Sequence, residues 1–298
     1  MPLWQPKRGA QKQAGMCMGF GCNAAGVVGC RIIDSERERL LAVLTNSFVP
    51  CNGRYPALIS LLSMFFIGAA AGGWNTLLSA LLLTALIALG VGATFAATRL
   101  LSKTILKGVP SSFVLELPPY RRPQVGKVIV RSIFDRTLFV LGRAASVAAP
   151  AGAILWLMAN VQAGGESLLS LCAGWLDPLG RFMGLDGVIL VAFILGFPAN
   201  EIVLPIIIMA YTAQGSLTEL GELAQLRLLL LQNGWSWVTA LCVMLFSLMH
   251  WPCSTTLLTI KKETGSWKWT ALAAALPTAA GFVCCAATAA AARLLGLG

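Results

Sequence analysis

Charged residues are unevenly distributed along this chain, and the long gaps between them predict helices that cross a membrane. Residues 55–98 contain no Asp, Glu, Lys, Arg or His. Because one helical crossing takes about 20 apolar residues, this run is long enough for two crossings joined as a helical hairpin. The turn of the hairpin is expected at Gly72-Gly73-Trp74-Asn75. Arg54 and Arg99 flank the run, which predicts that both of its ends lie on the cytoplasmic side.

Further apolar stretches follow, and two of them contain helix breakers. Spans are expected over 144–163 and over the alanine-rich residues 269–292, while the mildly acidic residues 164–186 are expected to form an outer loop. Glycine, proline or ionisable residues interrupt 187–213 and 228–260, which predicts broken helices. The predicted fold class is an all-α polytopic membrane protein with about six to seven transmembrane segments, including two broken helices in repeated gate-like halves.

Composition agrees with a membrane protein. Of the 298 residues, 57% are hydrophobic and 11% are charged, whereas a soluble domain has about 25% charged residues, so a soluble globular enzyme is excluded. The net charge is +10, and the basic residues lie mainly in the expected loops. The positive-inside rule accounts for this distribution, and the expected partner is therefore the lipid membrane, with no nucleic acid. The cysteines show no regular spacing, which argues against a disulfide scaffold.

A weak internal repeat is the most informative motif. Gly19-Phe20-Gly21-Cys22-Asn23 matches Gly196-Phe197-Pro198-Ala199-Asn200, and Val49-Pro50-Cys51 matches Trp251-Pro252-Cys253 in the same order. Helix breaks at corresponding positions of two halves commonly mark the binding site of a transporter. A break also frees backbone carbonyls, which membrane depth tolerates only against protein or a wet cavity. The repeat therefore predicts a transport path.

The charge pattern and the repeat together divide the chain into four parts. Residues 1–54 are expected to form a cytoplasmic or interfacial segment with the first gate motif, and 55–98 the transmembrane hairpin. Residues 99–143 are expected to form a basic cytoplasmic linker with an amphipathic helix, and 144–298 the second membrane half with broken helices. In the first part, Ser35-Glu36-Arg37-Glu38 has the form of a capping box, which predicts the start of a helix.

The side chains at the breaks favour a divalent transition metal. The available groups are thiols, amide oxygens, one carboxylate and one imidazole, and thiolate and imidazole suit first-row transition metals. The candidate metal ligands are Cys22, Cys51 and Cys253, and the candidate path or gate residues are Gly19, Gly21, Asn23, Pro198, Asn200, Glu201, His250 and Pro252.

Each of these residues also has a purely structural interpretation. Cysteine in a helix is commonly a small apolar packing residue, which is the expectation for Cys17, Cys30, Cys172, Cys242, Cys284 and Cys285. His250 could be hydrogen-bonded in place, and Glu201 could pair with a basic residue at the membrane edge. The chain contains no phosphate-binding loop and no nucleophile motif, so we expect that it binds no nucleotide and is not an enzyme.

The chain resembles the ferrous iron transport protein B (FeoB) family. The resemblance rests on six blocks in family order: Gly19 to Asn23, Ser35 to Leu40, Cys51-x-Gly53-Arg54-x-Pro56, Leu115 to Arg121, Pro252-Cys253, and Lys262 to Trp269. It implies import of Fe(II), as transported substrate, across a bacterial cytoplasmic (inner) membrane. It also implies that Cys22, Cys51 and Cys253 are iron ligands or gate residues.

Members of this family normally carry a GTP-binding domain and further spans ahead of the Gly-Phe-Gly-Cys-Asn motif. This chain starts just ahead of the motif, so the resemblance implies a GTP-binding domain or N-terminal transporter part supplied in trans. Homo-oligomerisation stays open. The alternatives are a transporter of a nucleoside-like or other small solute, and a non-transporting membrane subunit or truncated fragment.

Overall fold

The computed structural model describes residues 17–106 without 34 and 68–72, residues 126 and 130, residues 139–212 without 164, and residues 223–296. Most of the expected basic linker, including its amphipathic helix, lies outside the described residues. The described part is helical, apart from one hairpin of two-residue strands, β1 (Gln162–Ala163) and β2 (Glu166–Ser167). This confirms the all-α class.

The first part of the chain is built of short helices and one long helix. In chain order these are α2 (Asn23–Gly29), η1 (Cys30–Ile32), α3 (Glu36–Thr45), η2 (Asn46–Phe48), η3 (Asn52–Arg54), α4 (Tyr55–Leu62), the π-helix η4 (Ser63–Ile67) and α5 (Gly73–Lys103). The hydroxyl of Ser35 accepts a hydrogen bond from the Glu38 amide at 3.5 Å, as the capping box predicts.

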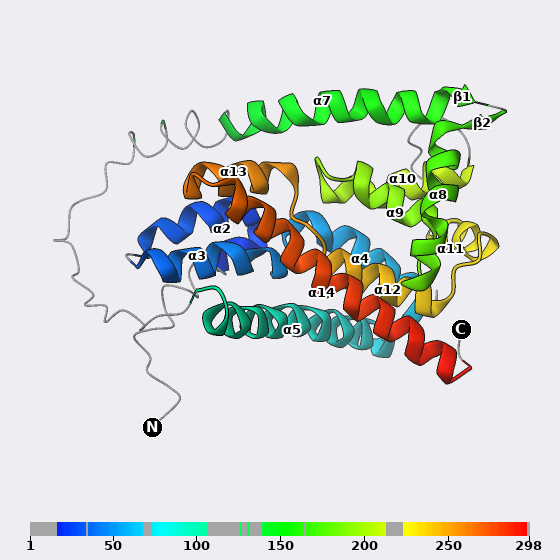
Figure 1. Cartoon of the computed structure of the whole chain (residues 1–298). Helices are drawn as coiled ribbons and strands as arrows, with labels where there is room; N and C mark the ends of the chain where they lie inside the picture. Colours follow the sequence, from blue (N-terminus) through cyan, green and yellow to red (C-terminus); the bar gives the residue numbers. More distant parts are fainter. Residues whose placement is uncertain are drawn as a thin grey trace.

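The second part alternates long and broken helices. It comprises α7 (Phe139–Asn160), α8 (Leu168–Phe182), α9 (Gly187–Leu195), η6 (Asn200–Ile202), α10 (Val203–Thr212), α11 (Leu223–Gln232), α12 (Trp237–Leu248), α13 (Ser254–Thr264) and α14 (Trp267–Leu294). Figure 1 shows α14 running obliquely across the other helices, with α5 along one side and α7 along the other.

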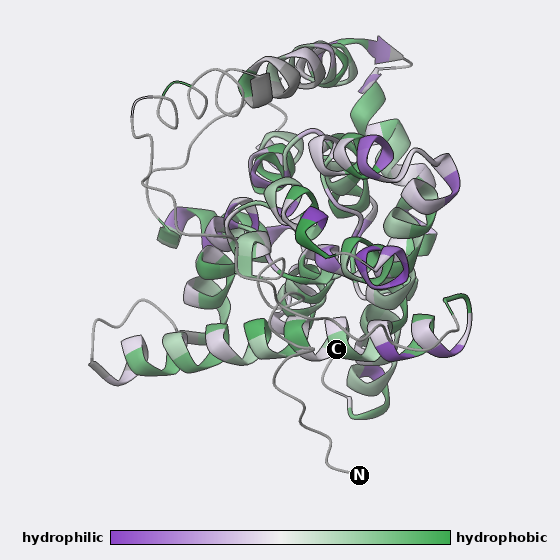
Figure 2. Cartoon of the chain, turned by 90° about the vertical axis from the view of Figure 1, so that its left-hand side faces the viewer, coloured by the Kyte–Doolittle hydropathy of each residue, from purple (hydrophilic) through white to green (hydrophobic). Residues whose placement is uncertain are grey.

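Among the described residues, two helices are long and apolar enough to cross a membrane, over Thr76–Lys103 and Trp267–Leu294. The pairs α8 with α9 and α11 with α12 also qualify if each is one span, bent by 109° and 106°. By length and composition, the described part can therefore supply two to four crossings, and the count of six to seven stays a prediction. Figure 2 shows that hydrophobic positions dominate the helices.

The prediction that residues 164–186 form a loop is wrong, because most of this range forms β2 and α8, while the outer location of this range stays a prediction. The Ser167 hydroxyl caps α8 by accepting from the Ser170 amide at 3.2 Å. The chain then reverses at Gly184, whose φ of 72° favours glycine, and Asp186 caps α9 by accepting from the Ile189 amide at 2.7 Å. Of the three acidic residues, Asp186 thus caps α9, Asp177 lies on α8 and Glu166 lies in β2.

The helix α14 packs closely, as its small residues predict. It contacts α12, α13 and α3, and Ala273, Gly281 and Cys285 are buried in these contacts. A Cβ added to Gly281 would lie 2.6 Å from the carbonyl oxygen of Met249. Only a glycine permits this approach of α14 to the end of α12.

Candidate functional site

Both Gly-Phe-x-x-Asn motifs break a helix in the same way. Cys22 has φ −152° and ψ 124° and directly precedes α2, which starts at Asn23. In the second half, Ala199 has φ −149° and ψ 120° and precedes η6, which starts at Asn200. The matching extended conformations confirm the breaks that the repeated motif predicts, at the level of the backbone.

The Pro-Cys pairs also occupy equivalent positions. Cys51 (φ −88°, ψ 166°) and Cys253 (φ −59°, ψ 158°) are both extended and stand immediately before a helical segment, η3 and α13 respectively. We call the segments 49–51 and 251–253 the Pro-Cys turns. In each half, the Pro-Cys turn therefore ends an irregular stretch, and a helical segment starts directly after it.

Each motif asparagine contacts the stretch that leads into the Pro-Cys turn of its own half. With its amide nitrogen donating, Asn23 bonds to the carbonyl oxygens of Gly19 and Val49 at 3.1 and 3.2 Å. In the second half, the Oδ1 atom of Asn200 lies 3.3 Å from Nε2 of His250. The asparagines thus hold each break against its Pro-Cys turn.

The four irregular segments converge across the two halves. The helix α13, which starts after Cys253, packs against α2, and η3 packs against η6, so each Pro-Cys turn lies near the break of the other half. Within the second half, the Ser254 amide donates to the carbonyl oxygen of Phe197 at 2.9 Å. Figure 1 shows α13 beside α2.

The three candidate cysteines lie in this region but do not form a closed metal cage. Cys22 is exposed, whereas Cys51 and Cys253 are partly buried. The Sγ atom of Cys253 is 3.3 Å from the hydroxyl oxygen of Thr256. In the described part of the chain, no three His, Cys, Asp or Glu side chains are grouped to hold a metal ion.

The histidine is buried and hydrogen-bonded in place, which matches its structural interpretation. His250 is 1% exposed, and its ring contacts Phe193, Phe246 and Trp251. Its Nδ1 lies 2.9 and 3.1 Å from two main-chain carbonyl oxygens, so Nδ1 carries a hydrogen. In the neutral ring, Nε2 is then an acceptor, so it accepts a hydrogen bond from Asn200 when the amide nitrogen of the asparagine, in place of Oδ1, faces the ring.

The remaining candidates are two glycines, two prolines and one glutamate. A Cβ added to Gly19 would lie 2.7 Å from Oδ1 of Asn46, so that side chain would have to shift, whereas nothing would meet a Cβ at Gly21. Pro198 lies in the turn of the second break and Pro252 is buried in its Pro-Cys turn. Glu201 is exposed, and its Oε2 lies 3.7 Å from the position of a Cβ on Gly53.

Arg54, which precedes the uncharged run 55–98, is fully buried inside the protein, and the cytoplasmic side of both ends of that run stays a prediction. The side chain of Arg54 donates to main-chain carbonyls near both Pro-Cys turns. The described part contains four buried side-chain groups without a hydrogen-bond partner, and all lie in or beside these turns: Ser47 Oγ, Arg54 Nε, Trp251 Nε1 and Ser254 Oγ. Sequence reasoning missed this polar centre, whose only local signal was an arginine three residues after Cys51.

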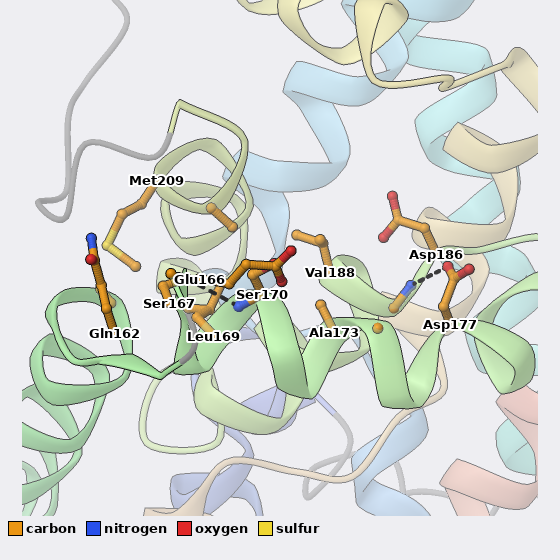
Figure 3. Close-up of a pocket in the computed structure, with 15 residues that line it drawn as sticks. Gln162, Glu166, Ser167, Leu169, Ser170, Ala173, Asp177, Asp186, Val188 and Met209 are labelled. Atoms are coloured by element: carbon orange, nitrogen blue, oxygen red, sulfur yellow. Dashed lines mark hydrogen bonds between the residues drawn. The ribbon is translucent and has the colours of Figure 1, made fainter.

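A separate cavity of about 660 Å³ lies between α7, α8, α9 and α10. Figure 3 shows that three carboxylates line it, Glu166, Asp177 and Asp186. Each has a structural partner. Glu166 accepts from the Ser170 hydroxyl at 3.2 Å, Asp177 accepts from the Gly187 amide at 3.2 Å, and Asp186 accepts from the Tyr211 hydroxyl. Asp177 and Asp186 therefore stabilise the α8–α9 bend, whereas Glu166 bonds at the start of α8.

Comparison with known proteins agrees with the family resemblance. Residues 76–135 match the family model "Ferrous iron transport protein B C terminus", and residues 141–267 match the Gate model, described as "Nucleoside recognition". The second match includes Gly196 to Glu201 and Pro252-Cys253. No solved structure matches the chain.

Curated relatives cover most of the chain. The Fe(2+) transporter FeoB of Staphylococcus aureus is 29% identical over 279 residues, which are 90% of this chain and 39% of the relative. FeoB of Methanocaldococcus jannaschii is 29% identical over 85% of this chain, and FeoB of Legionella pneumophila is 32% identical over 70% of it. These matches span 37% and 28% of the respective relatives. The chain therefore belongs to the FeoB family and corresponds to a C-terminal membrane region of it.

Proposed function

We propose that this chain forms the membrane path of a ferrous iron importer, with Fe(II) passing between the two halves at their helix breaks. The observation that carries the proposal is the convergence of two breaks and two Pro-Cys turns with matching backbone conformations. The relatives are named Fe(2+) transporters, and the thiols at this point suit that ion.

Three thiols that do not form one closed site among the described residues suit passage of an ion better than its storage. Conduction requires sites that bind an ion well enough to admit it and weakly enough to release it. Cys22, Cys51 and Cys253 are not grouped into one cage in the described residues, so the ion would move from one thiol to the next. Each thiol must lose its proton to be a good ligand, and the arriving cation favours that loss.

The proposal includes a partner and a location. The chain spans about two fifths of the S. aureus relative, and we propose that a GTP-binding domain or N-terminal transporter part acts with it in a bacterial cytoplasmic membrane. The basic part 99–143 is its proposed docking surface. Attraction of this part to anionic lipids is the competing explanation, and the two differ in whether the added GTPase domain binds lipid-free protein.

Fe(II) uptake into proteoliposomes under anaerobic conditions tests the path. We expect uptake that saturates, with or without the added GTPase domain, and a loss of at least about tenfold in Cys22→Ser, Cys51→Ser and Cys253→Ser, since changes next to metal ligands already cost that much. Cys172→Ser is the matched control: Cys172 is an exposed cysteine on α8, and this variant should retain uptake. Wild-type uptake in all three serine variants would contradict the thiol path.

A nucleoside-like solute is the second candidate, because the model matched by residues 141–267 is described as nucleoside recognition. Uptake of a radiolabelled nucleoside into the same vesicles distinguishes the two functions. Nucleoside uptake that survives serine at all three cysteines, together with no Fe(II) uptake, would favour this candidate.

A further inference from the structure

Arg54 is the largest fully buried side chain of the described residues, and its hydrogen bonds reach both halves of the molecule. One terminal nitrogen, Nη1, donates to the carbonyl oxygens of Ser47 at 3.1 Å and Leu248 at 2.9 Å. The other, Nη2, donates to the carbonyl oxygen of His250 at 3.5 Å. A single guanidinium therefore joins the main chain at Ser47 to the main chain at Leu248, which is 194 residues from Arg54 itself in the sequence.

These acceptors lie at the entrances of the two Pro-Cys turns. Ser47 precedes the turn that contains Cys51, whereas Leu248 and His250 precede the turn that contains Cys253. Arg54 is also fixed to its own turn, because its amide donates to the carbonyl oxygen of Cys51 at 2.9 Å. The side chain thus spans from one cysteine-bearing turn to the other.

Burying the charged side chain of Arg54 costs free energy. A buried charge is costly unless hydrogen bonds or an opposite charge compensate it. In the described part of the chain, Arg54 makes no salt bridge with a carboxylate, and its Nε has no hydrogen-bond partner. A guanidinium offers five donors in a rigid fork, which a lysine ammonium cannot reproduce. Arginine is therefore suited to three carbonyls in fixed positions.

We propose that Arg54 is a positioning residue: it ties the Pro-Cys turns of both halves together and so fixes the separation of Cys51 and Cys253. The effect of Arg54 on transport rests on the proposed function, because the separation of Cys51 and Cys253 can change a transport rate only if Fe(II) passes between them. Its effect on geometry does not depend on transport, and the two are measured separately.

Spin labels on Cys51 and Cys253, with all other cysteines replaced by alanine, measure the separation by pulsed electron paramagnetic resonance. We expect one narrow distance distribution with Arg54, a broad or shifted one in Arg54→Gln, and an intermediate one in Arg54→Lys. Arg99→Gln, at an exposed arginine of α5, is the matched control and should keep the narrow distribution. An unchanged distribution in Arg54→Gln overturns the proposal, even if that variant unfolds at a lower temperature.

Fe(II) uptake by variants with all cysteines intact supplies the second readout. We expect the maximal uptake rate to fall at least about tenfold in Arg54→Gln, and less in Arg54→Lys, while the Fe(II) concentration for half-maximal uptake changes little. An unchanged maximal rate overturns the proposal. If wild-type protein transports no Fe(II), the proposed function fails and the distance measurement still decides the role of Arg54. If neither variant folds, a broad distance distribution with Arg54 present overturns the proposal.

Discussion

At the scale of single residues, the site depends on polar side chains that bind main-chain carbonyls. Asn23 and Arg54 are buried and donate to main-chain carbonyls in or beside the irregular segments. At membrane depth such groups must be satisfied by protein or by water in a cavity. These side chains therefore stabilise the breaks and determine their shape at the same time.

Asn23→Ala should lower the free energy of unfolding in detergent by about 1–3 kcal/mol, because it leaves buried carbonyls of Gly19 and Val49 unpaired. Asn233→Ala is the control, since Asn233 is exposed and bonds only within its own helix turn. Denaturation followed by circular dichroism gives both values. Equal losses in the two variants would show that Asn23 has no special role.

The same scale shows where prediction from sequence succeeded and failed. The breaks before Asn23 and Asn200 were predictable, because a repeated local motif indicates them. The burial of Arg54 was not, because its partner Leu248 is distant in the chain and offers only a main-chain atom. A charge beside a long apolar run has the same local pattern whether it lies at a membrane surface or inside the protein.

At the scale of elements, sharp bends determine how the broken helices pack. Gly184 and Gly234 have positive φ values of 72° and 81° and stand at the bends of 109° and 106°. The two bends are linked, because Tyr211 donates to Asp186 and accepts from the indole nitrogen of Trp235 at 2.8 Å. The second bend was not predicted, since no charged residue marks it in the apolar run.

Gly281→Ala should destabilise the protein by about 1–3 kcal/mol, because the new methyl group meets the Met249 carbonyl at the contact between α14 and α12. Gly92→Ala on α5 is the matched control: nothing lies within 4 Å of the added Cβ, so a helical alanine should be neutral or stabilising. Thermal unfolding of both variants in the same detergent shows whether Gly281→Ala lowers the stability while Gly92→Ala leaves it unchanged or raises it. A Gly281→Ala variant as stable as wild type would contradict the close packing.

At the scale of the whole molecule, the two halves are also joined by an ion pair. Arg31, just after α2, donates two hydrogen bonds of 2.6 Å to Glu263 at the end of α13. This carboxylate raises the pKa of Arg31, so the arginine stays charged. Because the Arg31 side chain is 60% exposed, solvent screening limits the strength of the pair.

A double-mutant cycle of Arg31→Gln and Glu263→Gln should give a coupling energy of at most about 1 kcal/mol, decreasing with added salt. The pair Arg181 and Asp177, within α8, is the local comparison, with about 0.3–0.5 kcal/mol expected. A coupling energy for Arg31 and Glu263 that salt does not change would mean that the pair is shielded from solvent.

The acceptors of Arg54 have a consequence for how the site can diverge among relatives. Every residue type carries a main-chain carbonyl, so positions 47, 248 and 250 can accept substitutions without losing the hydrogen bonds that Arg54 donates. Selection would then act on position 54 alone and leave no correlated changes between the two halves. Methods that infer contacts from covariation should miss this link, whereas superposition of structures should reveal it.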